Sequence, residues 1–415
     1  MQAPSTARKP GLLLDGVSAS LRSAAPGILW FTAVRTVSLV ALVLLSPGSP
    51  GYTVDRLAVH WDAAWYVGIA QHGYDHSFHP PTAAGHPSPR SNLAFFPVYP
   101  ALVRGVHTML PGMGWGGAAL LVAGTCALVA AWGIHAVTAL CYGRRVALLT
   151  TVLWGIAPVA VVETAGYSES AFIALAAWAL LAVLRHDWLP AAALSVAAGL
   201  TRPVGVAVAA AVMAVACREV VQRRPGRVAA VEPGSPSAVS VPPPAPARLW
   251  KPVAAFIAAP LGWLGFIAWT GWRMHDWGAY FRIQRMWNSR FDFGLQTIHG
   301  FGKLFTRSTL VNLYFPASAL LLITAVVLLV ITVNQRQPLP LVVYSLIITA
   351  VALGDSAHWS SRGRFLLPAF PLLIPVAKAL SRAGDRRTRI AVLAGLGIVS
   401  ACYGGYLMLY SVGAP

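Results

Sequence analysis

The sequence contains few charged residues, and few of those are acids. Charged residues make up 11% of its 415 residues, whereas soluble domains carry about 25%. It has 13 Asp and Glu residues against 31 Lys and Arg residues, which gives a formal net charge of +18. So little charge excludes an ordinary soluble domain.

Cysteine is scarce as well. The four cysteines are Cys126, Cys141, Cys217 and Cys402. No two of them form a Cys-x-x-Cys pair, and all lie in or beside apolar segments. This spacing argues against a disulfide framework and against a cysteine metal site.

The Lys and Arg residues cluster in short gaps between apolar runs. This distribution is what the positive-inside rule predicts for the cytoplasmic loops of a membrane protein. The sequence shows no signature of an RNA- or DNA-binding module. We therefore expect the basic residues to orient the chain in a membrane, and we expect no nucleic-acid partner.

Long apolar runs, in contrast, are abundant. Hydrophobic residues make up 57% of the chain and the mean hydropathy is +0.63. Repeated runs of roughly 20 residues match the thickness of a bilayer. The sequence therefore predicts an all-α polytopic membrane protein with about 11 transmembrane helices and no internal repeat. The predicted spans are 27–45, 117–140, 146–162, 170–185, 188–217 in two halves, 252–272, 308–333, 339–355, 364–380 and 390–410.

The spans group into two modules. Residues 27–217 form the N-terminal module and residues 252–415 the C-terminal one. The linker at 218–251 is rich in Arg, Pro and Ser, which predicts a disordered cytoplasmic segment. Residues 1–26 form a basic cytoplasmic tail without a convincing signal-cleavage site. In a plasma membrane, the charge rule then places the long loop at 46–115 and the C-terminus outside.

Two segments interrupt the regular pattern of spans. Residues 95–110 must begin and end outside if 117–140 runs inward, so we expect a second interfacial helix there. Residues 188–217 are broken by Thr201-Arg202-Pro203. A broken backbone is tolerated at membrane depth only where protein or a water-filled cavity lines it.

The loop at 273–307 departs from the charge rule, because it is basic although it falls outside. Cations on that side would suit an anionic lipid phosphate.

The outer loop at 46–115 contains the stretch His60–Tyr74, which carries the acid Asp62 among Trp, Tyr and His residues. We expect this stretch to form a helix at the membrane surface, with its aromatic residues at headgroup level. Two stripes run along such a helix, with His60, Ala64 and Val67 on one and Trp61, Trp65 and Gly68 on the other.

Asp62 has two interpretations. It could be a loop carboxylate or a cap of the surface helix. It could instead be a general base that takes a proton from an acceptor hydroxyl. The aromatic residues around it could anchor the segment at the interface and could also stack on the faces of a sugar.

A family resemblance favours the second interpretation. The stretch His60–Tyr74, followed by Asn92–Pro100, resembles the first-loop signature of the PIG-V family. That family contains GPI mannosyltransferase II and many actinobacterial membrane proteins, and the Ala- and Arg-rich composition suits such a bacterial member. Tyr167–Ser170, Gly199–Pro203 and Arg362–Pro368 resemble the later motifs of the family in the same order. The paired first-loop motifs are specific, whereas the later three are common in the wider GT-C class.

The resemblance implies a GT-C glycosyltransferase fold with two juxtamembrane helices in the first outer loop. It also implies a polyprenyl-phosphate-linked sugar donor, usually mannose, and an extracytoplasmic active site. Asp62 matches the acid of the family's first loop and would therefore be the catalytic base. Because a lipid phosphate is a good leaving group, an inverting transfer would need one base and cations on the phosphate, without a covalent intermediate.

Further candidates lie near the outer ends of the spans. Glu163 and Glu169 could cap helices or bind acceptor hydroxyls. Arg202, Arg362 and Arg364 could reach toward lipid headgroups or hold the donor phosphate. The remaining candidate substrate-binding residues are His60, Trp61, Trp65, Tyr66, Tyr74 and His358.

No cofactor is expected. The histidines of the outer loop are His72, His76, His79 and His86, and their spacing matches no standard metal site. A divalent cation held by Asp62 and a nearby histidine stays open as an alternative.

We favour a membrane glycosyltransferase, most simply a mannosyltransferase. A transporter or lipid flippase would need ionisable residues deep within its spans and repeated halves, and the sequence shows little of the first and none of the second. A non-catalytic scaffold of the same fold would tolerate loss of Asp62. The acceptor is left open among a lipid, a glycan and a protein.

Overall fold

The structure is a computed structural model, and it describes residues 10–80, 88–223, 249–306, 312–356, 359–411 and 413. The described residues form helices joined by short connections, and their only β-type pairing is an isolated bridge between Phe291 and Asp355. Residues 224–248 of the linker predicted at 218–251, together with His86 and His358, lie outside the described residues. Residues 218–222 and 250–251 are helical, so the linker predicted to be disordered is shorter than expected at both ends.

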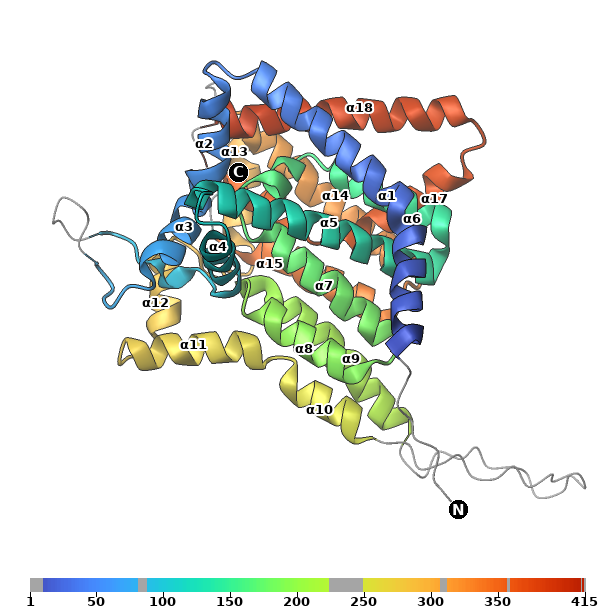
Figure 1. Cartoon of the computed structure of the whole chain (residues 1–415), viewed down its shortest axis with the longest axis horizontal. Coiled ribbons are helices and arrows are strands. Elements are labelled where there is room, and N and C mark those ends of the chain that lie inside the picture. The colour runs from blue at the N-terminus through green and yellow to red at the C-terminus, as the bar shows by residue number, and fades with distance from the viewer. Residues whose placement is uncertain are drawn as a thin grey trace, which may run out of the picture.

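Long apolar helices lie side by side and form the body of the molecule (Figure 1). Among the described residues, six helical stretches are long and apolar enough to cross a membrane, which shows a multi-pass membrane protein. They are Gly16–Leu44 in α1 (Pro10–Leu44), α5 (Trp115–Tyr142), Pro203–Gln222 with α9 (Val206–Gln222), Trp250–Arg273 with α10 (Trp250–Ala258) and α11 (Leu261–Arg273), α14 (Tyr314–Asn334), and Arg386–Tyr410 with α18 (Arg386–Gly405). Shorter apolar helices are α7 (Glu169–Leu184), α8 (Trp188–Gly199) and α15 (Leu339–Gly354). The total of eleven crossings stays a prediction.

Prolines bend the segment that was predicted to be a span at 364–380. The chain forms Trp359–Leu366, which includes α16 (Arg362–Leu366), and then Phe370–Arg382, which includes α17 (Ile374–Arg382). The two parts are bent by 75°. Pro368 and Pro371 lie at the break, and a proline removes a backbone donor and clashes with the preceding turn. The segment predicted as the span 364–380 is therefore a bent pair of helices that begins at Trp359.

Another break falls where the sequence predicts it. The helix α8 ends at Gly199, the residues 200–202 are irregular, and a short 3-10 turn, η3 (Pro203–Gly205), leads into α9. A further span ends earlier than expected, because α6 (Arg144–Gly155) is followed by a separate 3-10 turn, η2 (Ala160–Thr164). The first of these irregular segments contains Arg202, which belongs to the candidate site described below.

Small residues let the central helices approach closely. Ala130 and Ala131 of α5 and Ala177 of α7 are fully buried. A Cβ atom added to Gly133 of α5 would lie 2.9 Å from the Cβ atom of Ala177. Close approach of this kind is the usual way in which membrane helices gain packing contacts.

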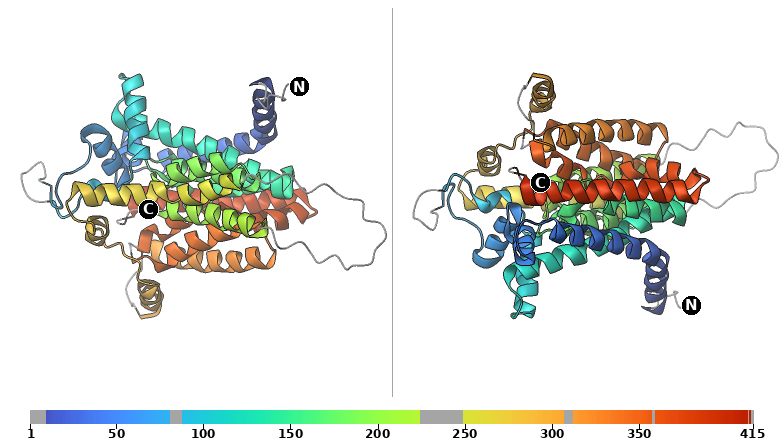
Figure 2. Two further views of the ribbon diagram at one scale, coloured as in Figure 1. Left: turned by 90° about the horizontal axis from the view of Figure 1, so that it is seen from below. Right: turned by 90° about the horizontal axis from the view of Figure 1, so that it is seen from above.

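Short helices gather at one end of the bundle (Figures 1 and 2). These are α2 (Pro50–Val59), α3 (Asp62–His72), η1 (Asn92–Ala94), α4 (Val98–Met109), α12 (Ala279–Met286) and α13 (Leu295–Thr306). Figure 2 shows α4, in cyan, lying across the direction of the long helices. A helix at residues 95–110 is therefore confirmed, and its position at a membrane surface stays a prediction.

Candidate active site

Four charged side chains from distant parts of the chain meet where α3, α7, α16 and the break before η3 converge. Arg364 Nη1 lies 2.7 Å from Asp62 Oδ2, and Arg364 Nε lies 3.2 Å from Glu169 Oε1. Arg202 Nη1 lies 2.6 Å from the same Glu169 oxygen. We call Asp62, Glu169, Arg202 and Arg364 the charge cluster. The sequence predicts each of these residues as a site residue, and the structure brings the four together.

The charge cluster is buried at one end and reaches the surface at the other. Glu169 is fully buried, and the side chains of Arg202 and Arg364 are 10% and 7% exposed. The Asp62 side chain is 20% exposed and is the most accessible of the four. A ligand that approaches the cluster from solvent therefore meets Asp62 and its contact with Arg364 first.

A sharp turn in the backbone positions Asp62. The helix α2 ends at Val59, His60 is extended, and Trp61 has a φ angle of 49°. Positive φ angles are unusual for a bulky residue and mark local strain, which is often found at functional sites. Asp62 then begins α3, where an acid is favoured in the first turn.

This turn overturns part of the expected surface helix. A helix was predicted over residues 60–74, whereas α3 covers only Asp62–His72. His60 and Trp61 therefore belong to neither of the two expected stripes. Trp61 instead packs beneath Arg56, whose guanidinium carbon lies 4.5 Å from the centroid of the indole ring.

Two hydroxyl groups extend the charge cluster toward α3. The Tyr66 hydroxyl lies 2.6 Å from Ser168 Oγ, and Arg202 Nη1 donates to the same oxygen at 3.0 Å. Burial raises the pKa of the Tyr66 phenol well above its ordinary value, so the group stays neutral. Tyr66 was predicted from the sequence, but Ser168 was missed. Its position directly before Glu169 in the later motif was the available signal.

Local structure places the two arginines of the cluster. Arg202 lies in the break before η3 with an extended backbone, φ −153° and ψ 154°. Arg364 lies on α16, just before the proline bend. Its guanidinium carbon lies 5.2 Å from the centroid of the Tyr167 ring, an additional cation–π contact. Both arginines are thus held on short irregular segments between long helices.

Other predicted residues lie elsewhere. Glu163 is fully buried beside Arg35 of α1, with 4.0 Å between Oε2 and Arg35 Nε. Arg35 also donates to Thr164 Oγ1 at 3.0 Å. Arg35 lies within the predicted first span and was not predicted as a site residue. Arg362 donates to the backbone oxygens of Ala352 and Asp355 at 3.0 and 2.7 Å, and so caps the end of α15.

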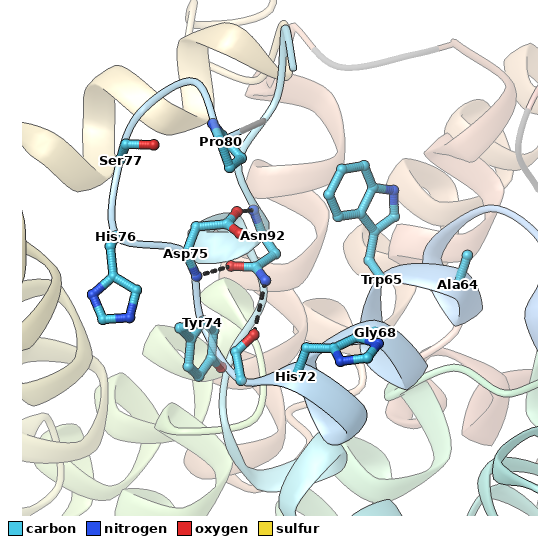
Figure 3. A pocket seen from close by; sticks show the side chains of 11 residues that line it. Ala64, Trp65, Gly68, His72, Tyr74, Asp75, His76, Ser77, Pro80 and Asn92 are labelled. Carbon is cyan, nitrogen blue, oxygen red and sulfur yellow. Dashed lines mark hydrogen bonds between the residues drawn. The ribbon is translucent and has the colours of Figure 1, made fainter. Parts of the chain in front are cut away.

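A pocket of about 490 Å³ opens on the neighbouring side of α3 (Figure 3). Its wall includes Trp65, Gly68 and His72 from α3 and the loop residues His76 and Ser77. Trp65 follows Asp62 by three residues, so the two side chains are neighbours on the helix surface. The pocket therefore begins one helical turn from the charge cluster, although none of the four cluster residues lines it.

Hydrogen bonds hold the loop that closes the pocket. Asp75 Oδ2 accepts from the backbone nitrogen of Asn92 at 2.7 Å, and the Asn92 side chain accepts from the backbone nitrogen of Asp75 at 2.9 Å. Arg273 donates to the backbone oxygens of Tyr74 and Asp75 at 2.8 and 2.9 Å. Two of these residues, Asp75 and Asn92, were not predicted as site residues. Tyr74 was predicted as a site residue, and it lines the wall of the pocket.

Aromatic rings support the pocket from behind. The Trp65 ring is stacked near Phe95, with 5.9 Å between ring centroids, and meets Trp287 edge-on at 4.9 Å. These contacts fix the orientation of Trp65, and a fixed aromatic face beside polar groups is suited to binding a sugar ring. Among the described residues, no group of three or more His, Cys, Asp or Glu side chains could hold a metal ion.

Comparison with known proteins gives weak likenesses. No protein-family model matches the chain, and no curated protein matches it, so the resemblance to the PIG-V family remains one of motifs. Among solved structures, the chain is similar to ArnT from Cupriavidus metallidurans bound to undecaprenyl phosphate. The TM-score is 0.49 with 16% identity, and the match covers 90% of this chain and 63% of that chain.

The chain is also similar to the Archaeoglobus fulgidus oligosaccharyltransferase in complex with Zn and sulfate. The TM-score is 0.43 with 15% identity, over 92% of this chain and 53% of that chain. The same enzyme, AglB, in complex with an inhibitory peptide and a dolichol-phosphate gives a TM-score of 0.41 with 14% identity. This match covers 93% of this chain and 56% of that chain. The chain thus spans 53 to 63% of the length of these proteins. All three scores lie below 0.5, so the function has to be argued from the site.

Proposed function

We propose that the protein is a membrane glycosyltransferase of PIG-V type, which transfers mannose from a polyprenyl phosphate to a hydroxyl group of an acceptor. The observation that carries this proposal is the contact of a partly exposed acid, Asp62, with Arg364 at 2.7 Å. The contact places a candidate base directly beside a candidate phosphate ligand. Base and cation at one point are what an inverting transfer from a lipid phosphate requires.

In this mechanism Asp62 takes the proton from the acceptor hydroxyl. The acceptor oxygen attacks the anomeric carbon from the face opposite the phosphate. The bond between that carbon and the phosphate oxygen breaks, and the phosphate leaves with the electron pair. Arg364 and Arg202 stabilise the negative charge that develops on it, because guanidinium groups bind phosphate oxygens in pairs. The step needs no metal ion and no covalent intermediate.

The pocket beside α3 would bind the acceptor, and a sugar-bearing acceptor suits it best. Trp65 would stack on a sugar ring, Gly68 would let the ring approach the helix, and His72 would bind its hydroxyl groups. The volume of about 490 Å³ falls in the range of small-molecule sites. We place this site on the extracytoplasmic face of the plasma membrane, as the charge distribution of the chain predicts.

The test is a transfer assay with washed membranes that contain the wild-type protein, labelled polyprenyl-phosphate mannose and an acceptor extract. Wild-type membranes should transfer label into lipid or glycan. Asp62→Asn should lower the transfer rate about 10²- to 10⁴-fold, the usual contribution of a general base. Asp55→Asn removes an exposed acid from α2 in the same outer loop and should leave transfer unchanged. Near-normal transfer by folded Asp62→Asn protein would contradict the proposal.

A further inference from the structure

The charge cluster is neutral as a whole. Two carboxylates meet two guanidinium groups, and each guanidinium group already contacts at least one carboxylate oxygen. A phosphate that binds Arg364 therefore does not find a free cation. It has to take the place of a carboxylate that is already there.

The two carboxylates are held very differently. Glu169 is fully buried, and one of its oxygens contacts both Arg202 and Arg364. Removing it from these contacts would leave an uncompensated charge in the interior, which is costly. Asp62 contacts only Arg364 among the arginines of the cluster, and its side chain is 20% exposed. Solvent can stabilise Asp62 when this contact is lost, so Asp62 is the carboxylate that can be exchanged.

The same contact also occupies the candidate base. Arg364 Nη1 lies 2.7 Å from Asp62 Oδ2, and that oxygen is then less available for a hydroxyl proton. The other contact of Arg364, through Nε to Glu169, would keep the guanidinium group in place while Nη1 changes partner. One arginine can thus be anchored on one side and exchange ligands on the other.

We infer that the lipid phosphate and Asp62 compete for Arg364, and that binding of the phosphate releases Asp62 to act as the base. This inference rests on the proposed function. The base is then unmasked only when the donor is bound, so water is not activated in the empty enzyme. Glu169 is a positioning residue in this scheme, because it holds both arginines without touching the reacting atoms.

Competition for Arg364 predicts that loss of the Asp62 charge strengthens the binding of polyprenyl phosphate. Asp62→Asn, which should transfer sugar far more slowly, should bind polyprenyl phosphate more tightly than the wild-type protein, because the competing negative charge is gone. We expect a decrease in Kd of about tenfold, which corresponds to about 1.4 kcal/mol. Binding can be measured with purified protein in nanodiscs of neutral lipid, from the change in tryptophan fluorescence on addition of polyprenyl phosphate.

A double-mutant cycle identifies the arginine involved. Arg364→Gln should weaken binding, and Asp62→Asn should no longer tighten it when Arg364→Gln is also present. Asp55→Asn, the charge-matched control on α2, should bind like the wild-type protein. Size-exclusion profiles should match the wild-type profile, and Asp62→Ala should repeat the tighter binding if the Asn side chain itself disturbs the site.

The outcomes separate this inference from the proposed function. Tighter binding by Asp62→Asn that depends on Arg364 supports the competition. Unchanged or weaker binding by Asp62→Asn and Asp62→Ala, in a protein whose wild type transfers mannose, overturns the competition and leaves the proposed function standing. Tighter binding that persists with Arg364→Gln also overturns it. Absence of both transfer and binding in the wild-type protein overturns the proposed function and the inference together.

Discussion

Two fully buried glutamates lie close together in the chain, between α6 and the start of α7, yet their surroundings differ. Glu163 faces Arg35 of α1, with 4.0 Å between the nearest charged atoms. Glu169 contacts Arg202 at 2.6 Å and Arg364 at 3.2 Å, and through Arg364 it is connected to the partly exposed Asp62. The Arg35–Glu163 pair is enclosed by the protein, whereas the charge cluster reaches the surface at Asp62.

The difference separates an enclosed ion pair from one that a ligand can reach from solvent. The Arg35–Glu163 pair ties α1 to η2, and both side chains are almost completely buried, at 5% and 0% exposed. No ligand can replace either partner without opening the bundle. In the charge cluster, one partner can leave for solvent while the others stay. A buried carboxylate in a membrane helix bundle is therefore not evidence of chemistry until its connection to the surface is known.

Glu169→Gln should have the largest effect of the substitutions that probe this comparison. It leaves Arg202 and Arg364 without their shared counter-charge, and breaking a buried ion pair costs about 3 to 5 kcal/mol. Transfer should fall about 10²-fold or more, because the phosphate ligands lose their position. Thermal unfolding in detergent and the transfer assay measure the two effects. A variant that transfers sugar at the wild-type rate would exclude Glu169 from the site.

Glu163→Gln is the matched test at the other pair and should have a smaller effect. Arg35 keeps its hydrogen bond to Thr164, so we expect a loss of about 1 to 3 kcal/mol in unfolding free energy. Transfer per folded molecule should not change, because this pair has no contact with the charge cluster. A loss of transfer beyond the loss of folded protein would show that Glu163 belongs to the reactive site after all.

Tyr66→Phe should have the smallest effect. It removes one neutral hydrogen bond, from Tyr66 to Ser168, which is worth about 0.5 to 1.5 kcal/mol. Ser168 keeps its contact with Arg202, so the cluster should remain assembled and transfer should fall less than about tenfold. Transfer rates measured with Tyr66→Phe and with Ser168→Ala would show which of the two hydroxyl groups contributes more to transfer. A loss as large as that of Glu169→Gln would give Tyr66 a direct role in transfer.

Much of the site could be predicted residue by residue. Asp62 stands out as an acid in an aromatic segment, and Arg202 falls in a visible helix break. Glu169 and Arg364 lie near predicted span ends. Their pairing could not be predicted, because the four residues come from four segments far apart in the chain. The functional assignment of the arginines changed accordingly: Arg364 joins the cluster, whereas Arg362, two residues earlier, caps α15.

Two local features of the backbone were not predicted from the sequence. Pro368 and Pro371 are the sequence signal for the bend of 75° within the span predicted at 364–380. The turn at His60 and Trp61 carries no such signal, because neither residue is a usual breaker of helices. In the structure Trp61 has a φ angle of 49° and packs under Arg56.

The sequence by itself determined that the chain is a helical, multi-pass membrane protein, and it singled out the candidate acids and arginines. Apolar runs and charge distribution decide membrane insertion locally, so they can be read along the chain. Which carboxylate meets which guanidinium group depends on contacts between distant helices, and only the tertiary structure decided that. The structure alone shows that Glu163 ends in a closed pair and that Asp62, through Arg364, is the exposed member of a buried cluster.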